Sequence, residues 1–204
     1  MKIICIGRNY AEHAKEMGSA LPDKPVFFLK PDTALFGKGQ EFYYPDFTND
    51  LHHEIELVVK ISKHGKRIDE KFAGNYYSEI GLGIDFTARD LQDEAKKKGL
   101  PWEIAKSFDN AAVVSAEFIP VSEFSDIQNI NFHLKINDTI VQQGNSTHMI
   151  FKVNQLIAHV STFITLKQGD LLFTGTPAGV GPVKIGDQLT GYLENRQLLE
   201  FFIK

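Results

Sequence analysis

The sequence predicts an α+β fold that is mainly β. Apolar and charged residues alternate over 53–61, which is typical of a strand with two different faces. From residue 116 onward, short strand patterns are separated by turn residues. Helix signals are confined to three segments, near 10–17, 88–98 and 149–163.

Composition restricts the class of protein. The 204 residues carry a net charge of −4, spread along the chain, which gives no basic surface for nucleic acid or for a membrane. No segment approaches the ~20 apolar residues of a membrane span, and no targeting pattern is visible. The one cysteine, Cys5, lies in an apolar run and is expected to pack in the core. We therefore expect a single cytoplasmic domain over residues 1–204.

The N-terminal segment predicts a strand followed by a helix. Residues 2–6 are apolar, and Asn9 with Glu12 resembles a capping box for a helix over 10–17. Gly18 is expected to end that helix, because glycine adopts the left-handed conformation of a C′ residue without strain.

The next segment is rich in proline and aromatic residues. Over 19–50 we expect one short strand, near 26–30, between loops. Lys30 could face a ligand, but a lysine exposed to solvent is the commoner case and is expected here. The strand over 53–61 follows.

The middle of the chain predicts a strand over 77–84 and then a helix over 88–98. Thr87 and Asp90 resemble an N-terminal cap, and Gly99 a C-terminal one. The lysines of 96–98 suit the negative end of the helix dipole and need no other function.

Beyond this helix the pattern becomes mainly β. Residues 100–115 are expected to be irregular chain packed by aromatic side chains. A hairpin is predicted around a turn at Asn137–Asp138, then a helix over 149–163 and a strand over 169–174. A second hairpin is expected to turn near 194–196.

Three carboxylates stand out as candidate metal ligands. Glu54 and Glu56 are two apart on a strand and therefore share a face, where their charges would repel. Asp85 follows at the end of another strand. Such acids are usually solvated, but a set of oxygen ligands without cysteine also suits Mg²⁺ or Mn²⁺.

Further polar residues could serve a small anionic substrate. His13 and Glu16 share one helix face, either as a surface pair or as a dyad in which Glu16 orients a proton-accepting imidazole. Arg89 and Gln92 also share a face, and Lys106 lies among aromatic residues.

A glycine-rich loop over 175–181 completes the candidate groups. It lacks the Walker and Rossmann spacings, so it is either a plain turn or a loop whose backbone and Thr176 hydroxyl approach a carboxylate.

Five motifs, in order, resemble the fumarylacetoacetate hydrolase family, most closely its short acylpyruvase and oxaloacetate decarboxylase branch. They cover nearly the whole chain: IGRNYAEH (6–13), LHHEIE (51–56), IDFTARDLQ (84–92), GLPW (99–102) with AKSF (105–108), and TGTP (174–177) with GVGP (179–182).

The resemblance implies a catalytic site and assigns its residues. Glu54, Glu56 and Asp85 would bind Mg²⁺ or Mn²⁺. The catalytic residues would be His13 and Glu16, activating water from a helix that can close as a lid, and Lys106 beside the substrate. The substrate-binding residues would be Arg8, Arg89, Gln92 and Thr176. Longer family members use another acidic ligand upstream of the histidine, where this chain has Cys5-Ile6-Gly7, so three protein ligands are expected.

The resemblance also implies a layered mixed β-sheet roll, a homodimer, and a metal-dependent hydrolase that cleaves the C–C bond of acylpyruvates. Oxaloacetate decarboxylation or keto–enol tautomerisation could use the same site. The alternatives are a decarboxylase or isomerase of longer unsaturated oxo-diacids, and a protein that binds metal and oxo acid without turnover. Pro45-Asp46, followed by Glu54 and Glu56, loosely resembles the pattern of a metal-dependent nuclease. This function is disfavoured, because the nuclease pattern requires lysine where Glu56 stands and because the chain is acidic.

Overall fold

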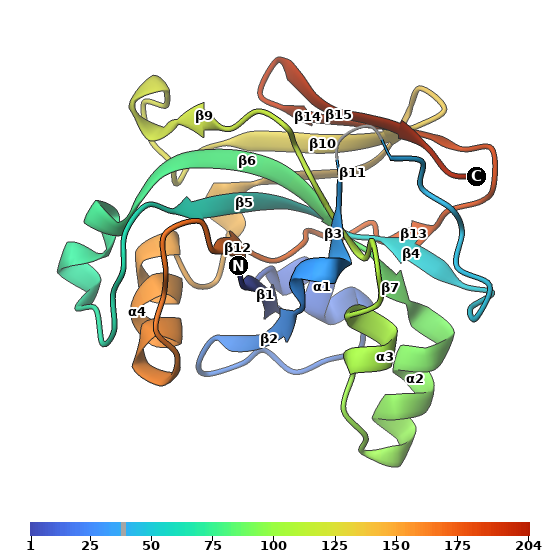
Figure 1. Cartoon of the computed structure of the whole chain (residues 1–204), viewed down its shortest axis with the longest axis horizontal. Coiled ribbons are helices and arrows are strands. Elements are labelled where there is room, and N and C mark those ends of the chain that lie inside the picture. The colour runs from blue at the N-terminus through green and yellow to red at the C-terminus, as the bar shows by residue number, and fades with distance from the viewer. Residues whose placement is uncertain (38–39) are drawn as a thin grey trace.

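The computed structural model describes residues 1–37 and 40–204. Within these ranges the strands form three sheets, with short helices at the sides (Figure 1). The expected α+β class with a predominance of β structure is confirmed.

The largest sheet is mixed and contains most of the first half of the chain. Its order is β2 (Val26–Lys30), β1 (Ile3–Gly7), β12 (Leu171–Phe173), β5 (Ile55–Ile61), β6 (Tyr77–Asp85), β8 (Ala112–Val114) and β3 (Leu35–Phe36), with β9 (Ile119–Pro120) paired to β6. The pairs β1–β12 and β3–β8 are parallel, and the other neighbours are antiparallel.

A second sheet comes from the two predicted hairpins. Its order is β11 (Thr139–Asn145), β10 (Asn131–Ile136), β14 (Gln188–Leu193) and β15 (Arg196–Phe202). It lies above β5 and β6 in Figure 1, and one hydrophobic core joins the two layers through Leu57, Leu82, Phe132 and Leu189. A small third sheet consists of β13 (Gly181–Pro182), β4 (Leu51–His53) and β7 (Thr87–Ala88).

The α-helices are short and lie around the sheets. They are α1 (Ala11–Glu16), α2 (Arg89–Lys98), α3 (Glu103–Lys106) and α4 (Val153–Phe163). Single 3₁₀ turns or short 3₁₀ helices cover Asp32–Ala34, Glu70–Tyr76, Val121–Glu123 and Ser146–His148. Gly18 and Gly99 have φ values of +60° and +64°, so both predicted helix ends are confirmed.

Some predicted elements differ in extent. The helix expected over 149–163 begins only at Val153, because Met149 instead forms a β-bridge with Tyr10. The segment expected to be irregular over 100–115 contains α3 and β8, and the loops over 19–50 contain β3 as well as β2.

Both predicted N-terminal caps are wrong. The Asn9 amide donates to the carbonyls of Phe151 and Thr174 and accepts from the Phe151 N–H, so it joins β1 to distant chain. The Thr87 hydroxyl donates to Glu54 Oε1 at 3.1 Å. Neither helix has a side-chain cap. Tertiary partners therefore use both side chains that favoured a local cap.

The strand predicted over 53–61 is interrupted at Glu54. β4 ends at His53 and joins the third sheet, whereas β5 begins at Ile55 in the main sheet. The buried Gln142 side chain holds this break, since its oxygen accepts from the Ile55 N–H at 3.0 Å and lies 2.7 Å from His53 Nδ1. Glu54 and Glu56 still point to one side, as the alternation requires.

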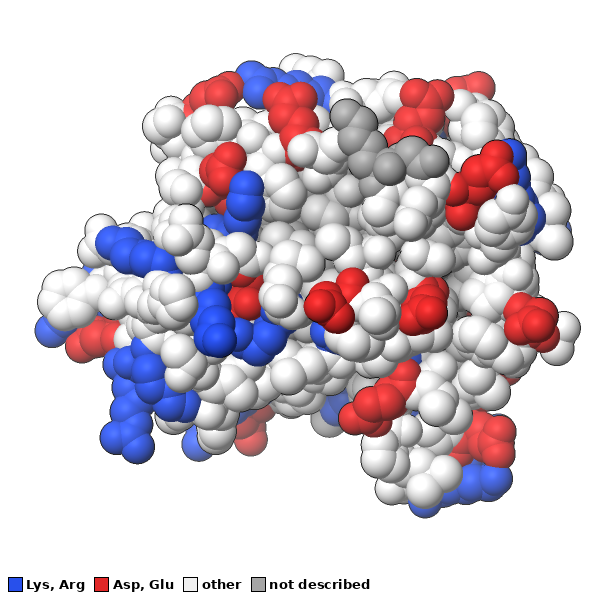
Figure 2. Space-filling model, viewed as in Figure 1, with Lys and Arg blue, Asp and Glu red and all other residues white. Residues whose placement is uncertain are grey.

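The surface shows no continuous basic area on the face in Figure 2. Lys and Arg side chains gather mostly at the left of this view, where acidic side chains interrupt them, and further acidic side chains are spread over the top, centre and right. Among the described residues, no helix has the length and apolarity needed to cross a membrane.

Candidate active site

The three predicted carboxylates form one buried cluster. Glu54 stands at the break before β5, Glu56 is on β5, and Asp85 ends β6. Antiparallel pairing brings the start of β5 beside the end of β6, so one oxygen from each acid lies within 4.8 Å of the others. We call these three residues the acid cluster; each is at most 5 % exposed.

Three buried cations contact the acid cluster. Lys106 donates to Glu54 Oε2 at 2.8 Å and to Asp85 Oδ2 at 3.0 Å. Arg89 donates to Glu54 Oε1 at 2.6 Å. Lys30 Nζ lies 2.7 Å from Asp85 Oδ1. These cations offset the repulsion that closely spaced carboxylates would otherwise suffer.

Lys30 corrects a sequence expectation. Its side chain is fully buried rather than exposed to solvent. Besides its ion pair, the ammonium donates to the carbonyl oxygens of Phe86, Lys106 and Ala111. Lys30 therefore ties Asp85 to the segment that carries Lys106. Its partners are more than fifty residues away in the sequence, so no local pattern could show this role.

Replacing Lys30 with methionine is expected to lower the free energy of unfolding by about 3 kcal/mol, because Asp85 loses an ion-pair partner and three carbonyls lose a donor. Urea denaturation in EDTA measures this loss. Lys60→Met is the control, since the exposed Lys60–Glu79 pair should contribute less than about 1 kcal/mol. Equal losses in the two variants would contradict a structural role for Lys30.

The carboxylates of the cluster have pKa values shifted in opposite directions. Burial alone would raise the pKa of Glu54, but the charges of Lys106 and Arg89 outweigh it and hold that pKa well below its usual range. Within residues 1–37 and 40–204, no cation forms an ion pair with Glu56; burial, with the charges of Asp85 and Glu54, raises its pKa well above the usual value. Burial opposes the charge of Lys106, yet Asp85 and Glu54 raise its pKa, so Lys106 is a cation.

The cluster fits a hard divalent cation. Asp85 Oδ1 is buried and accepts no hydrogen bond from the described residues, although Lys30 Nζ lies 2.7 Å away and donates to three carbonyl oxygens. All three candidate ligands are carboxylates, which Mg²⁺ and Mn²⁺ prefer. Asp85 Oδ1 can therefore accept a further partner, and the raised pKa of Glu56 shows that its carboxylate lacks enough neighbouring positive charge, which a divalent cation would supply.

His13 and Glu16 form the pair predicted from their spacing. Nδ1 of His13 lies 3.1 Å from Glu16 Oε2, and His13 is buried. The Gly179 N–H donates to both Glu16 oxygens, at 3.0 and 3.3 Å. This contact fixes α1 to the glycine-rich loop. Gly179 has φ +97°, and a Cβ there would lie 2.7 Å from the Val141 carbonyl oxygen, so the loop requires glycine at this position.

Thr176 lies in the same loop with its hydroxyl already occupied. It donates to the Ile55 carbonyl at 2.9 Å and accepts from the Gln142 side chain at 2.9 Å. Gln142, which the sequence did not single out, thus connects this loop to the strand break at Glu54. A substrate role for Thr176 stays a prediction, and it would require the hydroxyl to give up its Ile55 acceptor.

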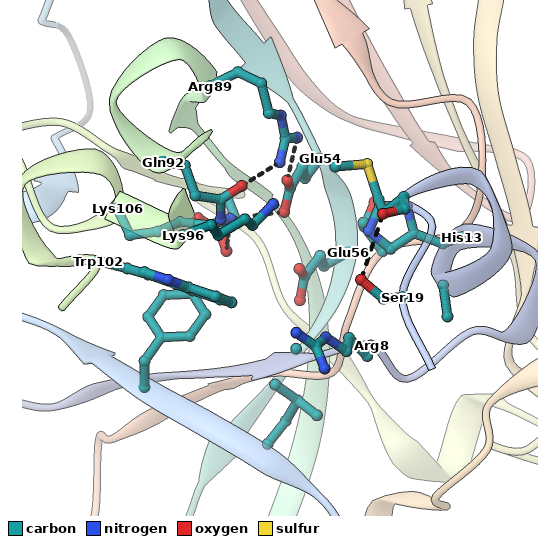
Figure 3. A pocket seen from close by; sticks show the side chains of 17 residues that line it. Arg8, His13, Ser19, Glu54, Glu56, Arg89, Gln92, Lys96, Trp102 and Lys106 are labelled. Carbon is teal, nitrogen blue, oxygen red and sulfur yellow. Dashed lines mark hydrogen bonds and ion pairs between the residues drawn. The ribbon is translucent and has the colours of Figure 1, made fainter. Parts of the chain in front are cut away.

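Nine of the ten predicted site residues line one cavity, which has about 50 Å³ of space open to water, enough for a few water molecules. Those that line it are Arg8, His13, Glu54, Glu56, Asp85, Arg89, Gln92, Lys106 and Thr176. Glu16 does not line the cavity, but its carboxylate contacts Nδ1 of His13, which does. Figure 3 shows His13 on one side of Glu56, and Trp102 and Lys96 on the other.

The cavity also holds residues that sequence reasoning missed. Lys96 lines it, although its position in the last turn of α2 suggested only a favourable helix-dipole contact. Lys96 is seven residues after Arg89 and four after Gln92. Residues at these spacings share a helix face, so the sequence could have placed Lys96 beside the two predicted substrate-binding residues. Arg8 has φ +59°, a conformation uncommon for residues other than glycine, where the chain leaves β1.

Comparison with known proteins agrees with this arrangement. The family model of the fumarylacetoacetate (FAA) hydrolase C-terminal domain matches residues 2–203. Human mitochondrial oxaloacetate tautomerase FAHD1 is 46% identical over 187 residues, covering 92% of this chain and 84% of that protein.

Two solved structures superpose over the full chain. A fumarylacetoacetate hydrolase family protein from Yersinia pestis CO92 has a TM-score of 0.94 and 45% identity, with 93% of its chain covered. Fumarylpyruvate hydrolase from Pseudomonas aeruginosa, in complex with Mn²⁺ and pyruvate, has a TM-score of 0.91 and 34% identity, with 90% covered.

Proposed function

Because the chain belongs to the fumarylacetoacetate hydrolase family, we propose that it is a divalent-metal-dependent enzyme of small 2-oxo acids, with keto–enol tautomerisation of oxaloacetate as its leading activity. The observation that carries this proposal is the buried acid cluster, contacted by Lys106 and open to a cavity lined by further cations. The name of the human relative supports oxaloacetate as substrate.

The acid cluster would hold Mg²⁺ or Mn²⁺, and the Mn²⁺ complex of the Pseudomonas relative supports this assignment. When bound, the cation would supply Lewis-acid chemistry that lowers the cost of negative charge on the substrate oxygens. The Lys106 ammonium would donate to the oxygen on which enolate charge develops. Arg89 and Gln92, joined at 2.7 Å, would orient the substrate, and Arg8 would add positive charge.

Hydrolysis of acylpyruvates, the activity expected first from the sequence, is a second candidate that the His13–Glu16 pair favours. His13 would take a proton from water while the water oxygen attacks the distal carbonyl carbon. The C3–C4 bond then breaks, its electron pair forms pyruvate enolate beside Lys106, and protonation at C3 gives pyruvate. Tautomerisation and oxaloacetate decarboxylation need no water, so one site could support all three reactions.

The test follows the ultraviolet absorbance of the enol form of oxaloacetate, and then of acetylpyruvate, with Mg²⁺ and with excess EDTA. We expect faster keto–enol equilibration of oxaloacetate with Mg²⁺ and none above background with EDTA. Acetate and pyruvate from acetylpyruvate would establish hydrolysis. Turnover of neither substrate would reject the proposal and favour longer unsaturated oxo-diacids or a binding protein without turnover.

Metal binding is expected to release a proton from Glu56. Its raised pKa means that this carboxyl keeps its proton to a higher pH than an ordinary glutamate does, and a metal ligand must be ionised. Metal affinity should therefore increase as the pH rises towards that pKa and level off above it. Calorimetry in PIPES and in Tris, which differ in ionisation enthalpy, measures the released protons. Glu56→Gln should abolish the release, and equal apparent enthalpies for the unchanged protein in both buffers would contradict this linkage.

The homodimer, the cytoplasmic location and the single-domain organisation expected from the sequence stay predictions.

A further inference from the structure

One cation of the cavity has no role in the proposed chemistry. Arg89, Gln92 and Lys96 form a stripe on the face of α2 that lines the cavity. The first two are occupied, since Arg89 contacts Glu54 and Gln92 accepts from Arg89. Lys96, one turn further along, has no such partner in the site, and Figure 3 shows it reaching towards the cavity beside Gln92 and Lys106.

The Lys96 ammonium lies beside the Trp102 ring and near one acid, Asp93. Its Nζ lies 5.8 Å from the centre of the Trp102 ring, and Trp102 packs edge-to-face on Phe28. Asp93 is 3.6 Å away but is 52 % exposed, so that pair is weak. Burial lowers the pKa of Lys96, with Arg89 acting in the same direction. The side chain is 32 % exposed, so an arriving carboxylate could reach the ammonium and pair with it.

The charge of the cavity favours a ligand with two negative charges. The acid cluster and its three contacting cations cancel. Arg8 and Lys96 add two positive charges, the divalent metal would add two more, and Glu16 subtracts one. A monoanion would leave a net charge of about +2 and a dianion about +1, by this count of formal charges.

We propose that Lys96 binds the distal carboxylate of a 2-oxo diacid, so that the site prefers such diacids to 2-oxo monoacids. This inference deepens the proposed function and rests on it for the placement of the 2-oxo group at the acid cluster. Trp102 fixes the direction of the Lys96 chain, and the carboxylate would lie at the cavity mouth, where the side chain is 32 % exposed.

The same contact has a consequence for oxaloacetate. Decarboxylation removes the negative charge of the distal carboxylate as the C3–C4 bond breaks and its electrons pass to the enolate. A cation paired with that carboxylate stabilises the reactant more than the transition state for CO₂ loss. Tautomerisation keeps the charge, so Lys96 favours tautomerisation over decarboxylation.

The test compares two ligands of equal length, oxaloacetate and 2-oxobutyrate, in which a methyl group replaces the distal carboxylate. Dissociation constants with Mg²⁺ are measured by the fluorescence of Trp102, the only tryptophan of the chain. We expect Lys96→Met to weaken oxaloacetate binding about tenfold and to leave 2-oxobutyrate unchanged. Lys96→Arg should retain the preference, and Lys97→Met, at an exposed neighbour outside the cavity lining, is the control for net charge.

The binding measurements test the role of Lys96 whether or not the protein converts oxaloacetate. Loss of the preference in Lys96→Met alone supports it, even if oxaloacetate is not converted and the proposed function fails. Equal binding of both ligands by the unchanged protein, or a preference that persists in Lys96→Met, overturns it. With turnover, decarboxylation should increase relative to tautomerisation in Lys96→Met, and a decrease would also count against the inference.

Discussion

An Asp85→Asn variant is expected to lose tautomerisation, decarboxylation and hydrolysis together, each by about 10³-fold. Asp85 is the candidate ligand whose Oδ1 accepts no hydrogen bond in the described part of the chain, and both Lys30 and Lys106 contact its carboxylate. The amide keeps the shape of the side chain but removes the charge that a divalent cation needs. Calorimetric titration with Mn²⁺ should show the loss of affinity directly, independently of any substrate.

The control for Asp85→Asn is a second buried aspartate. Asp170 accepts from the Lys2 and Lys167 N–H groups and pairs with the Lys2 ammonium, away from the cavity. Asp170→Asn should lower the melting temperature and leave Mn²⁺ affinity and activity within about threefold. If Asp85→Asn bound Mn²⁺ as the unchanged protein does, the acid cluster would not be the metal site.

The predicted hairpins are correct because their signals are local. Asn137 and Asp138 have φ values of +48° and +67°, the conformation of the tight turn that this pair favours, and Glu194 turns the second hairpin at +50°. Each turn joins strands that are adjacent in sequence, so alternation and turn residues suffice to predict the pairing.

The strand break at Glu54 could not be predicted in this way. It is held by Gln142, 87 residues from Ile55, whose side chain replaces the ladder hydrogen bond that a continuous strand would provide. Asn9 and Thr87 are further examples, because each resembles a cap in the local sequence but bonds to distant chain in the structure. A local sequence pattern indicates which hydrogen bonds a side chain is able to form, whereas tertiary contacts determine which partner it has in the folded protein.

For the candidate site, the residue types and motif order predicted ten residues, and nine of them line one cavity; their catalytic, substrate-binding and metal-binding roles stay predictions. The cations Lys30 and Lys96 were harder to predict from the sequence. Lys30 ends an ordinary apolar strand, and its burial depends on Asp85 and on carbonyls of three separate residues. Lys96 is one of three consecutive lysines that are all exposed in part, and its place beside Trp102 in the cavity lining distinguishes it from Lys97 and Lys98.

A His13→Ala variant is expected to lose acylpyruvate hydrolysis by about 10²–10⁴-fold, the usual effect of removing a general base. Oxaloacetate decarboxylation should change much less, because it needs no activated water, while the acid cluster and Lys106 are unchanged. Glu16→Gln should reduce hydrolysis by a smaller factor, since its amide oxygen can still orient the imidazole at Nδ1 but without charge.

The measurement for His13 is the ratio of two rates in one preparation, acetate formed from acetylpyruvate and pyruvate formed from oxaloacetate. A ratio removes differences in folded fraction or metal content, which would lower both rates equally. His133→Ala is the control, because that imidazole stacks on Tyr192 in the hairpin sheet and does not line the cavity. If His13→Ala reduced both rates by the same factor, His13 would serve binding or lid closure rather than the activation of water.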